Sequence, residues 1–322
     1  MIGGRTPPGD GRLPNDVQSE FLRACLVDGA AGREGLRTWL AGFDDPLEGL
    51  RRPDCADRQL LPLLHRARRD DGAVPAAVLR LLKAAVVHEE LRTEAIGAAA
   101  GDALDGLRDA GIEPLVIGGA ALAWGIYPAP ALRHCHNIDL LVAPGELAPA
   151  RSALGAFAAL DDPAPAACSL RLTHPSGTRI SLHSELHRGG RSAPAGLERR
   201  GISIAGRAVD ALGPSDLLVQ LCGNAAAAID PGLRWLADGS FVCSGGLVDW
   251  GRAHSHATLA RRTAPLSALL GWLDRNLGSD LAGAPRAALA RARRGELARE
   301  LVVRSPKGVR NRLRRALRDG RG

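Results

Sequence analysis

The chain has 322 residues, of which 45% are hydrophobic and 24% are charged, so it is long enough for one large or two ordinary domains and too apolar for a disordered protein. No collagen-like or heptad period runs through it, and its six cysteines form no C-x-x-C pair, which excludes a zinc ribbon and a disulfide framework. The formal net charge of +7 is concentrated at the C-terminus, because residues 304–321 carry eight basic residues and one acid.

The first third of the chain is expected to be a short lead followed by helices. Residues 1–16 are rich in Gly, Pro and charged residues and contain no apolar stretch that a signal peptide needs, so we expect a disordered lead and a cytoplasmic protein with reduced thiols. From 17 to 109 apolar residues recur at helical spacing, as at 60–64 and 78–86, with turn signals at 52–54 and 70–72. This pattern predicts an N-terminal helical segment.

The pattern changes between 110 and 210. Short apolar runs at 114–117, 138–142, 168–172 and 178–186 predict strands, which are separated by Gly/Pro turns and two short helices. Residues 115–132 are uncharged and reach the lower limit for a membrane span. Gly118-Gly119 and the Pro128/Pro130 pair divide this stretch into strand, turn, helix and loop, so we expect no membrane partner.

Helices are expected again from 211 to 301, and a basic tail follows from 302 to 322. Ser215 or Asp216 is predicted to cap a helix that runs through 217–221. The pI near 9.6 is typical of nucleic-acid-binding proteins, but here the basic residues lie in the tail and aromatic residues make up only 3% of the chain. We therefore expect no nucleic-acid partner except through the tail.

A candidate phosphate site lies where the first central strand ends. Gly118-Gly119 follows that strand, and a helix is expected to begin near Ala120. Glycines at such a junction allow a ligand to approach the backbone, and the N-terminus of the helix offers free N–H groups to an anion. The alternative interpretation is that the two glycines only make a tight strand-to-helix turn.

A candidate metal site follows on the second central strand. Strand alternation places Asn137 and Asp139 on one face, with Ile138 and Leu140 toward the core. A polar pair at a strand end suits Mg²⁺, which prefers carboxylate oxygens together with substrate phosphates. The same pair could also do no more than cap the strand.

These motifs together resemble a known family. The stretch VIGGAALAWGIYPAPALRHCHNIDLLV resembles the DNA-polymerase-beta-like nucleotidyltransferase superfamily. More closely, it is similar to the bacterial family labelled uncharacterised nucleotidyltransferase, whose usual form is L-K-G-A-A-L-A, then Y-P, L-R and D-I-D-L-L-V. The likeness includes LLPLLHRA, TRISLHSEL and LRWLADGSFVCSGGLVDW and spans roughly residues 35–270.

The resemblance implies a fold, a reaction and two ligands. The fold would be α+β, a small mixed-sheet nucleotidyltransferase-like core flanked by N-terminal and C-terminal helical segments. The reaction would transfer a nucleoside monophosphate from an NTP, bound with Mg²⁺, to a small-molecule or peptide acceptor. Gly118, Gly119 and Arg133 would contact the nucleotide, and Arg133 could equally pair with a nearby acid.

The chain departs from the family pattern at the residues that carry the chemistry. Of the three carboxylates expected by resemblance only Asp139 is present, because Asn137 and Ser181 stand at the other two positions, and Gly118 replaces the usual Lys. Two-metal nucleotidyl transfer needs several negative oxygens at one point. Two hypotheses therefore stay open: an active nucleotidyltransferase, or a catalytically impaired relative that binds a nucleotide or a partner.

One substitute for the missing acid is Glu185. Ser181, His183, Glu185 and His187 alternate onto one face of the expected strand, so Glu185 is the nearest acid on that face and His183 a candidate catalytic neighbour. A regular strand would place Glu185 about 13 Å beyond Ser181, so a bulge or bend would have to bring it back. The alternative is that these are solvated strand residues.

Other polar residues carry weaker signals. His134, Cys135 and His136 are metal-ligand types, but alternation sends the two histidines to one face and the cysteine to the other, which favours a loop-end cluster without metal. Asp238 and Asp249 match family positions in the helical half, where we expect helix caps and core contacts.

Overall fold

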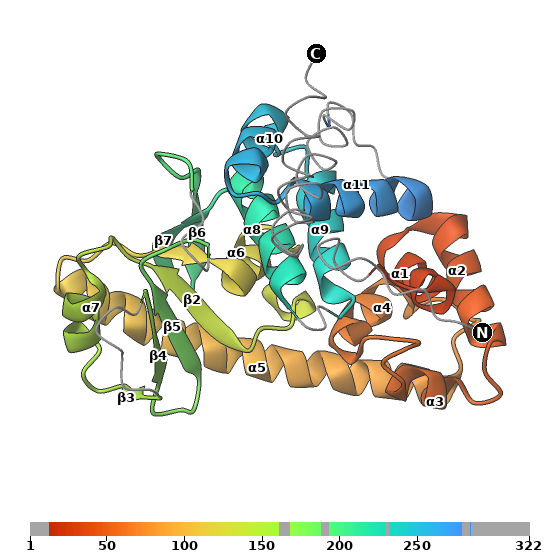
Figure 1. Cartoon of the computed structure of the whole chain (residues 1–322). Helices are drawn as coiled ribbons and strands as arrows, with labels where there is room; N and C mark the ends of the chain where they lie inside the picture. The colour runs from red at the N-terminus through yellow and green to blue at the C-terminus, as the bar shows by residue number, and fades with distance from the viewer. Residues whose placement is uncertain (1–12, 161–167, 188–192, 229–231, 279–283, 285–322) are drawn as a thin grey trace, which may run out of the picture.

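The computed structural model describes residues 13–160, 168–187, 193–228, 232–278 and 284. Within these residues the fold is a mixed β-sheet that packs against helices from both ends of the chain, as Figure 1 shows. The α+β expectation is confirmed. The basic tail and most of the expected N-terminal lead lie outside the described residues.

Helices occupy the N-terminal segment, as the periodicity predicts. Their bounds are α1 (Asp16–Leu26), α2 (Gly29–Ala41), α3 (Pro46–Arg51), the 3₁₀ turn η1 (Arg58–Leu60), α4 (Leu61–Arg68) and α5 (Ala76–Asp109). Local capping fixes where they begin: Asn15 and Gln18 form a reciprocal capping box at α1, and the carboxylates of Asp45 and Asp57 accept backbone N–H groups at α3 and η1.

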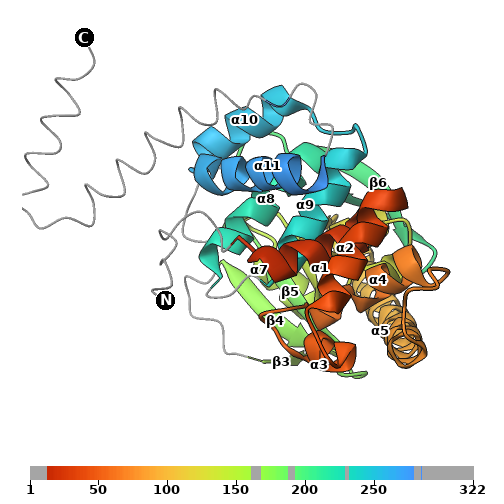
Figure 2. The same cartoon turned by 90° about the vertical axis from the view of Figure 1, so that its right-hand side faces the viewer.

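The long helix α5 connects the two halves of the molecule. Its 34 residues correspond to a length of about 50 Å. In Figure 1 it runs from the N-terminal helices to the sheet, and Figure 2 shows it nearly end-on. Most of its buried residues lie between Glu89 and Leu107, where it packs beneath the sheet and the central segment.

The sheet has the order β3-β4-β5-β2-β1-β7-β6. Its strands are β1 (Leu115–Ile117), β2 (Asn137–Leu141), β3 (Ala158–Ala159), β4 (Ser169–Thr173), β5 (Arg179–His183), β6 (Arg199–Ile204) and β7 (Arg207–Leu212). The pairs β1–β7 and β2–β5 are parallel and the others are antiparallel. The four predicted strands correspond to β1, β2, β4 and β5.

Three strands were not expected from the sequence. The hairpin β6–β7 turns at Ala205 and Gly206, which both have positive φ, at 48° and 80°. A two-residue turn of this kind matches the twist of a hairpin. Most residues of β6 are exposed or half-buried, and its Arg-rich sequence hides the alternation. The two-residue strand β3 is too short to give any signal.

Between the strands lie α6 (Gly118–Gly125), the 3₁₀ turn η2 (Pro130–Leu132) and α7 (Leu147–Ala153). The uncharged stretch 115–132 is therefore divided into strand, helix and turn, as its glycines and prolines predict. In the part of the chain that the structure describes, none of the helices has the length and apolar character needed to cross a membrane.

The C-terminal segment is helical as far as Leu277, and nearly all of the expected helical stretch from 279 to 301 lies outside the described residues. It contains α8 (Pro214–Ala227), α9 (Arg234–Ser244), α10 (Trp250–Leu259) and α11 (Thr263–Leu277). Asp249 caps α10, since its side chain accepts from the backbone N–H of Arg252, which confirms the expected cap. In both views α8 and α9 lie between α5 and the outer pair α10 and α11 (Figures 1 and 2).

The predicted cap of α8 is wrong. The helix begins at Pro214 with Gly213 as its N-cap, because proline is favoured in the first turn, where its missing N–H costs nothing. Ser215 and Asp216 lie inside the helix and are fully buried. Asp216 forms ion pairs with Arg252 and His256 of α10, so its carboxylate joins two helices instead of capping one.

A single hydrophobic core links all three segments. It extends from Phe21 and Trp39 in the N-terminal helices through Ile138 and Leu182 in the sheet to Leu269 in α11. The sheet and the helices therefore share one core, and this core holds the polar ends of the strands in place.

Candidate functional site

The strand face that carries Asn137 and Asp139 forms one wall of a pocket. Because β2 pairs in parallel register with β5, Asp139 lies directly opposite Ser181. Asn137 and Asp139 are half-buried on one face, whereas Ile138 and Leu140 are fully buried on the other. The predicted division of this strand into a polar and a core face is confirmed.

A hydrogen-bonded cluster surrounds the carboxylate of Asp139. The amide Nδ2 of Asn137 donates to Asp139 Oδ1 at 2.7 Å and to Ser181 Oγ at 3.1 Å. His183 donates from Nε2 to the same Asp139 oxygen at 3.1 Å. A carboxylate can only accept, so both neighbours direct N–H groups at it. The tertiary structure thus brings together four residues singled out in the sequence, and the carboxylate of Asp139 is the acid among them.

The two glycines face this cluster. Gly118 has φ +62° and a Cβ at that position would lie 3.2 Å from Asp139 Oδ2, while a Cβ on Gly119 would collide with the guanidinium of Arg133. The helix starts at Gly118, two residues before the predicted start, and the Gly118 N–H donates to Gln220 Oε1 at 3.0 Å. The glycines are needed because two side chains approach the backbone closely.

Arg133 is held on the opposite wall by Asp238 of α9. Its Nε and Nη2 donate to the two Asp238 oxygens at 3.2 and 2.9 Å, and the hydroxyl of Tyr127 donates to Asp238 Oδ1 at 2.8 Å. Burial by itself would lower the pKa of Arg133, but the adjacent Asp238 carboxylate raises it above the usual value. Of the two roles left open for Arg133, the structure shows the ion pair. The expected core contact of Asp238 is confirmed, although it does not cap a helix.

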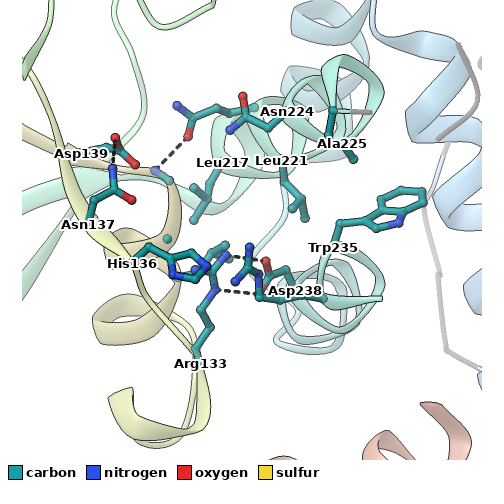
Figure 3. Close-up of a pocket in the computed structure, with 16 residues that line it drawn as sticks. Arg133, His136, Asn137, Asp139, Leu217, Leu221, Asn224, Ala225, Trp235 and Asp238 are labelled. Atoms are coloured by element: carbon teal, nitrogen blue, oxygen red, sulfur yellow. Dashed lines mark hydrogen bonds and ion pairs between the residues drawn. The ribbon is translucent and has the colours of Figure 1, made fainter. Parts of the chain in front are cut away.

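Together these groups enclose a pocket of about 290 Å³, the central pocket, shown in Figure 3. Ligand sites in proteins commonly have volumes of about 300–1,000 Å³. The residues that line it come from α6, the segment between η2 and β2, β2, α8 with the residue after it, and α9: Gly118, Gly119, Leu122, Arg133, His136, Asn137, Asp139, Leu217, Gln220, Leu221, Asn224, Ala225, Ala228, Arg234, Trp235 and Asp238. Both glycines therefore line the same pocket as Asn137 and Asp139, and Gly118 lies directly beside Asp139.

Sequence reasoning missed several members of this wall. Gln220 and Asn224 are one turn apart on α8 and line the pocket, and Arg234 enters it from the start of α9. The only signal was the family likeness of the segment around Arg234. These residues are more than 75 positions from Asp139 in the sequence, so no local pattern joins them to it.

The two histidines of the H-C-H motif lie together, and Cys135 is buried away from them. His134 Nδ1 is 2.8 Å from Glu89 Oε1, and His134 Nε2 is 3.2 Å from His136 Nδ1. Burial and the nearby positive groups lower the pKa of His136 to about 4, so its ring is neutral at pH 7. His136 lines the central pocket, whereas His134 does not line it and instead contacts Nδ1 of His136.

The structure does not bring Glu185 to the central pocket. Strand β5 ends at His183, three residues earlier than predicted, and one further bond, from Ser184 N–H to Cys168 O, follows before the chain leaves the sheet. Glu185 lines a different cavity with Glu113 and Glu146. The expectation of a solvated strand face fails for His187, which is buried against His256.

The residues around Asp139 fit one magnesium ion better than two. Among the described residues no group of three His, Cys, Asp or Glu side chains is arranged to hold a metal. The available donors are the Asp139 carboxylate, the Asn137 amide oxygen and the Ser181 hydroxyl. Mg²⁺ can be bound through one carboxylate when substrate phosphates and water supply the other ligands, whereas a two-metal clamp needs more negative oxygens.

Comparison with known proteins supplies one match. A family model described as uncharacterised nucleotidyltransferase matches residues 55–278, which include every element of the central pocket. Comparisons with curated proteins and with solved structures yield no match.

Proposed function

The chain belongs to the uncharacterised nucleotidyltransferase family, and we propose that within this family it binds a nucleoside triphosphate in the central pocket without efficient two-metal transfer. The nucleotide would lie between the β2 wall and helices α8 and α9. One Mg²⁺ would be held by Asp139 and Asn137, where it would neutralise phosphate charge. An active enzyme that transfers a nucleoside monophosphate to a small-molecule or peptide acceptor is the alternative outcome of the test below.

A single observation carries this proposal. Asn137 is within hydrogen-bond distance of both Asp139 and Ser181, which are paired across β2 and β5, and the family resemblance implies carboxylates at these three positions. Acids at all three would therefore form a compact anionic cage. Here a single carboxylate, Asp139, accepts hydrogen bonds from Asn137 and His183, and two formal negative charges that a two-metal clamp would use are missing.

The opposite wall supports binding of a polyphosphate. Arg133 and Arg234 both line the pocket, and Asp238 is the carboxylate that faces them on that wall. Two guanidinium groups against one carboxylate leave an excess positive charge. Guanidinium groups bind phosphate oxygens through pairs of N–H donors. The pocket thus offers a weak cation site on one side and an anion-binding wall on the other.

The test is calorimetric titration of ATP, GTP, CTP and UTP into native protein and variants, with Mg²⁺ or EDTA. We expect weak Mg²⁺-dependent binding to native protein. Asn137→Asp and Ser181→Asp together should tighten it by roughly tenfold or more, equivalent to about 1.4 kcal/mol, and this gain should vanish in EDTA because the added carboxylates then repel the triphosphate. Asp139→Asn should abolish the magnesium dependence.

A matched control is Ser152→Asp, which adds one negative charge on α7 outside the pocket lining and should leave nucleotide affinity unchanged. Native turnover of an NTP on the order of 1 s⁻¹ would show an active enzyme instead. If none of the four nucleotides binds native protein with or without Mg²⁺, the nucleotide-binding proposal is wrong.

A further inference from the structure

A second cavity adjoins the central pocket. This N-terminal cavity of about 800 Å³ lies where the N-terminal helices meet the start of α9. Two residues, His136 and Arg234, line both the central pocket and the N-terminal cavity, so the two spaces share a wall. Six of its lining residues, from Leu13 to Asp54, precede the part of the chain that the family model matches. The cavity is therefore completed by a part of the chain beyond the family match.

Within the part of the chain that the structure describes, no ion pair neutralises the charge of Arg234 in the shared wall. Arg133 takes both oxygens of Asp238. Arg234 instead donates to neutral acceptors, the side-chain oxygen of Gln59 and the backbone carbonyl of His134. Burial, followed by the charge of Arg133, lowers the pKa of Arg234, and the carboxylates of Asp238 and Asp57 oppose this only in part. An anionic group at this wall would supply the missing charge.

The rest of the N-terminal cavity is also cationic. Arg51 and Arg58 line it, are exposed, and form no ion pair among the described residues. Of its two carboxylates, Asp54 is already paired with Arg52 at 2.7 Å, and Asp57 accepts the backbone N–H groups of Gln59 and Leu233. Positive charge without a partner therefore exceeds negative charge at this surface.

A chain of hydrogen bonds fixes which nitrogen of His136 faces the shared wall. Glu89 Oε1 accepts hydrogen bonds, so His134 carries its proton on Nδ1 and its Nε2 accepts from His136 Nδ1 when both rings are neutral. His136 Nε2 then carries the lone pair of the ring and can accept a hydrogen bond. Its neighbour there is the amide nitrogen of Gln59 at 3.4 Å, a long contact that a ligand could replace.

From these observations we infer that the N-terminal cavity binds an anionic small molecule that carries a hydroxyl or N–H donor beside its charged group. The anionic group contacts Arg234, and the donor contacts His136 Nε2. Because both residues also line the central pocket, the bound molecule lies next to the nucleotide, in the position of a second ligand of the same site. Only the statement that the bound molecule lies next to the nucleotide rests on the proposed nucleotide site.

The experiment measures binding of three probes by calorimetry: citrate, tricarballylate, which is citrate without the hydroxyl, and inorganic pyrophosphate. The double variant Arg51→Gln/Arg58→Gln should lower the affinity for the anion that binds best by roughly tenfold. The control Arg66→Gln/Arg80→Gln removes two exposed charges from α4 and α5, outside this cavity, and should change nothing. Tighter binding of citrate than of pyrophosphate would identify a ligand with carboxylate groups. Tighter binding of pyrophosphate would identify a ligand with phosphate groups.

The role of His136 has its own readout. Native protein should prefer citrate to tricarballylate, and His136→Ala should remove this preference while Arg234 still binds both. Equal affinities in the cavity and control variants, or no binding of any probe, would overturn the inference. ATP is titrated into the same proteins. If native protein does not bind ATP but binds an anion probe in a way that depends on Arg51 and Arg58, the nucleotide proposal is refuted and the assignment of the cavity stands.

Discussion

The central pocket has two walls, and each contains one aspartate in a different environment. On the strand wall, Asp139 is 26% exposed and is held by neutral or weakly basic partners, Asn137 and His183. On the helical wall, Asp238 is only 2% exposed and is saturated by Arg133 and Tyr127. Both are acids of the same pocket, yet among the described residues both oxygens of Asp238 accept hydrogen bonds, whereas those to Asp139 all end on Oδ1 and leave Oδ2 for a ligand.

The difference separates a structural carboxylate from one available for function. A buried and fully paired carboxylate cannot bind a metal unless its ion pair breaks, and breaking a buried pair is costly. A half-exposed carboxylate can exchange water for a metal or a ligand at little cost. Sequence likeness alone marks both aspartates as family positions, whereas their surroundings assign them opposite roles.

The largest expected effect comes from Asp238→Asn. Removing this charge leaves the guanidinium of Arg133 buried without its partner, which should cost about 3–5 kcal/mol of unfolding free energy. Asp139→Asn is the matched substitution on the other wall and should cost less than about 1 kcal/mol. Urea unfolding of both variants measures the difference. Equal losses of stability would contradict the division between the two walls.

A second buried acid of the helical half sharpens the comparison through pH. Burial would raise the pKa of Asp216, but hydrogen bonds from His256 and Arg252 lower it to about 2, below the usual 3.8. A carboxylate whose pKa is lowered in the folded state stabilises the fold above pH 4 and loses that contribution as pH falls from 4 to 2, roughly 2 kcal/mol in all.

Asp216→Asn should therefore be less stable at neutral pH and should lose less stability than native protein between pH 4 and 2. Asp44→Asn, which changes an exposed carboxylate, controls for the substitution itself. Stability curves against pH from urea unfolding provide the measurement. A variant with the native acid profile would show that the carboxylate of Asp216 is not stabilised by its two partners.

Gly119→Ala tests the place where the two walls approach each other. The added methyl group would push the Arg133 guanidinium away from Asp238, and overpacking of this kind typically costs about 1–3 kcal/mol. Gly145→Ala is the control, because a Cβ there meets no atom within 4 Å. Thermal unfolding should show a clear loss for the first variant and almost none for the second; similar midpoints would mean that Arg133 moves aside freely.

The smallest effect is expected on the strand wall. Ser181→Ala removes an acceptor of the Asn137 amide, which keeps its bond to Asp139. The net loss should be about 0.5 kcal/mol, at the lower end of the typical contribution of one hydrogen bond. Ser152→Ala on α7 is the control for removal of an exposed hydroxyl. A loss as large as that of Asp238→Asn would show that the strand cluster is structural as well.

Much of the site could be predicted from the sequence because its signals are local. The period of two on β2 separated Asp139 from Ile138, and the double glycine located the strand-to-helix junction beside it. The departures from the family pattern at Asn137 and Ser181 also needed no coordinates. Each of these inferences depends on neighbours along the chain or on direct likeness to a motif.

Other features depended on packing between distant segments. Arg133 and Asp238 are 105 positions apart, and no pattern in the sequence chose between that ion pair and a phosphate contact. Glu185 shared an apparent strand face with Ser181, but the strand ends at His183 and Glu185 lines a different cavity. The hairpin β6–β7 was missed because an exposed edge needs little apolar alternation.

The sequence by itself therefore determined the fold class, the polar face of β2 and the shortage of carboxylates on it. Only the tertiary structure decided which acid is free, which arginine is paired, and that His136 and Arg234 separate two adjoining cavities. The physical reason is the sequence separation between the residues that interact. Backbone geometry repeats every few residues and leaves a readable period, whereas ion pairs and cavity walls form between side chains that only the packed core brings together.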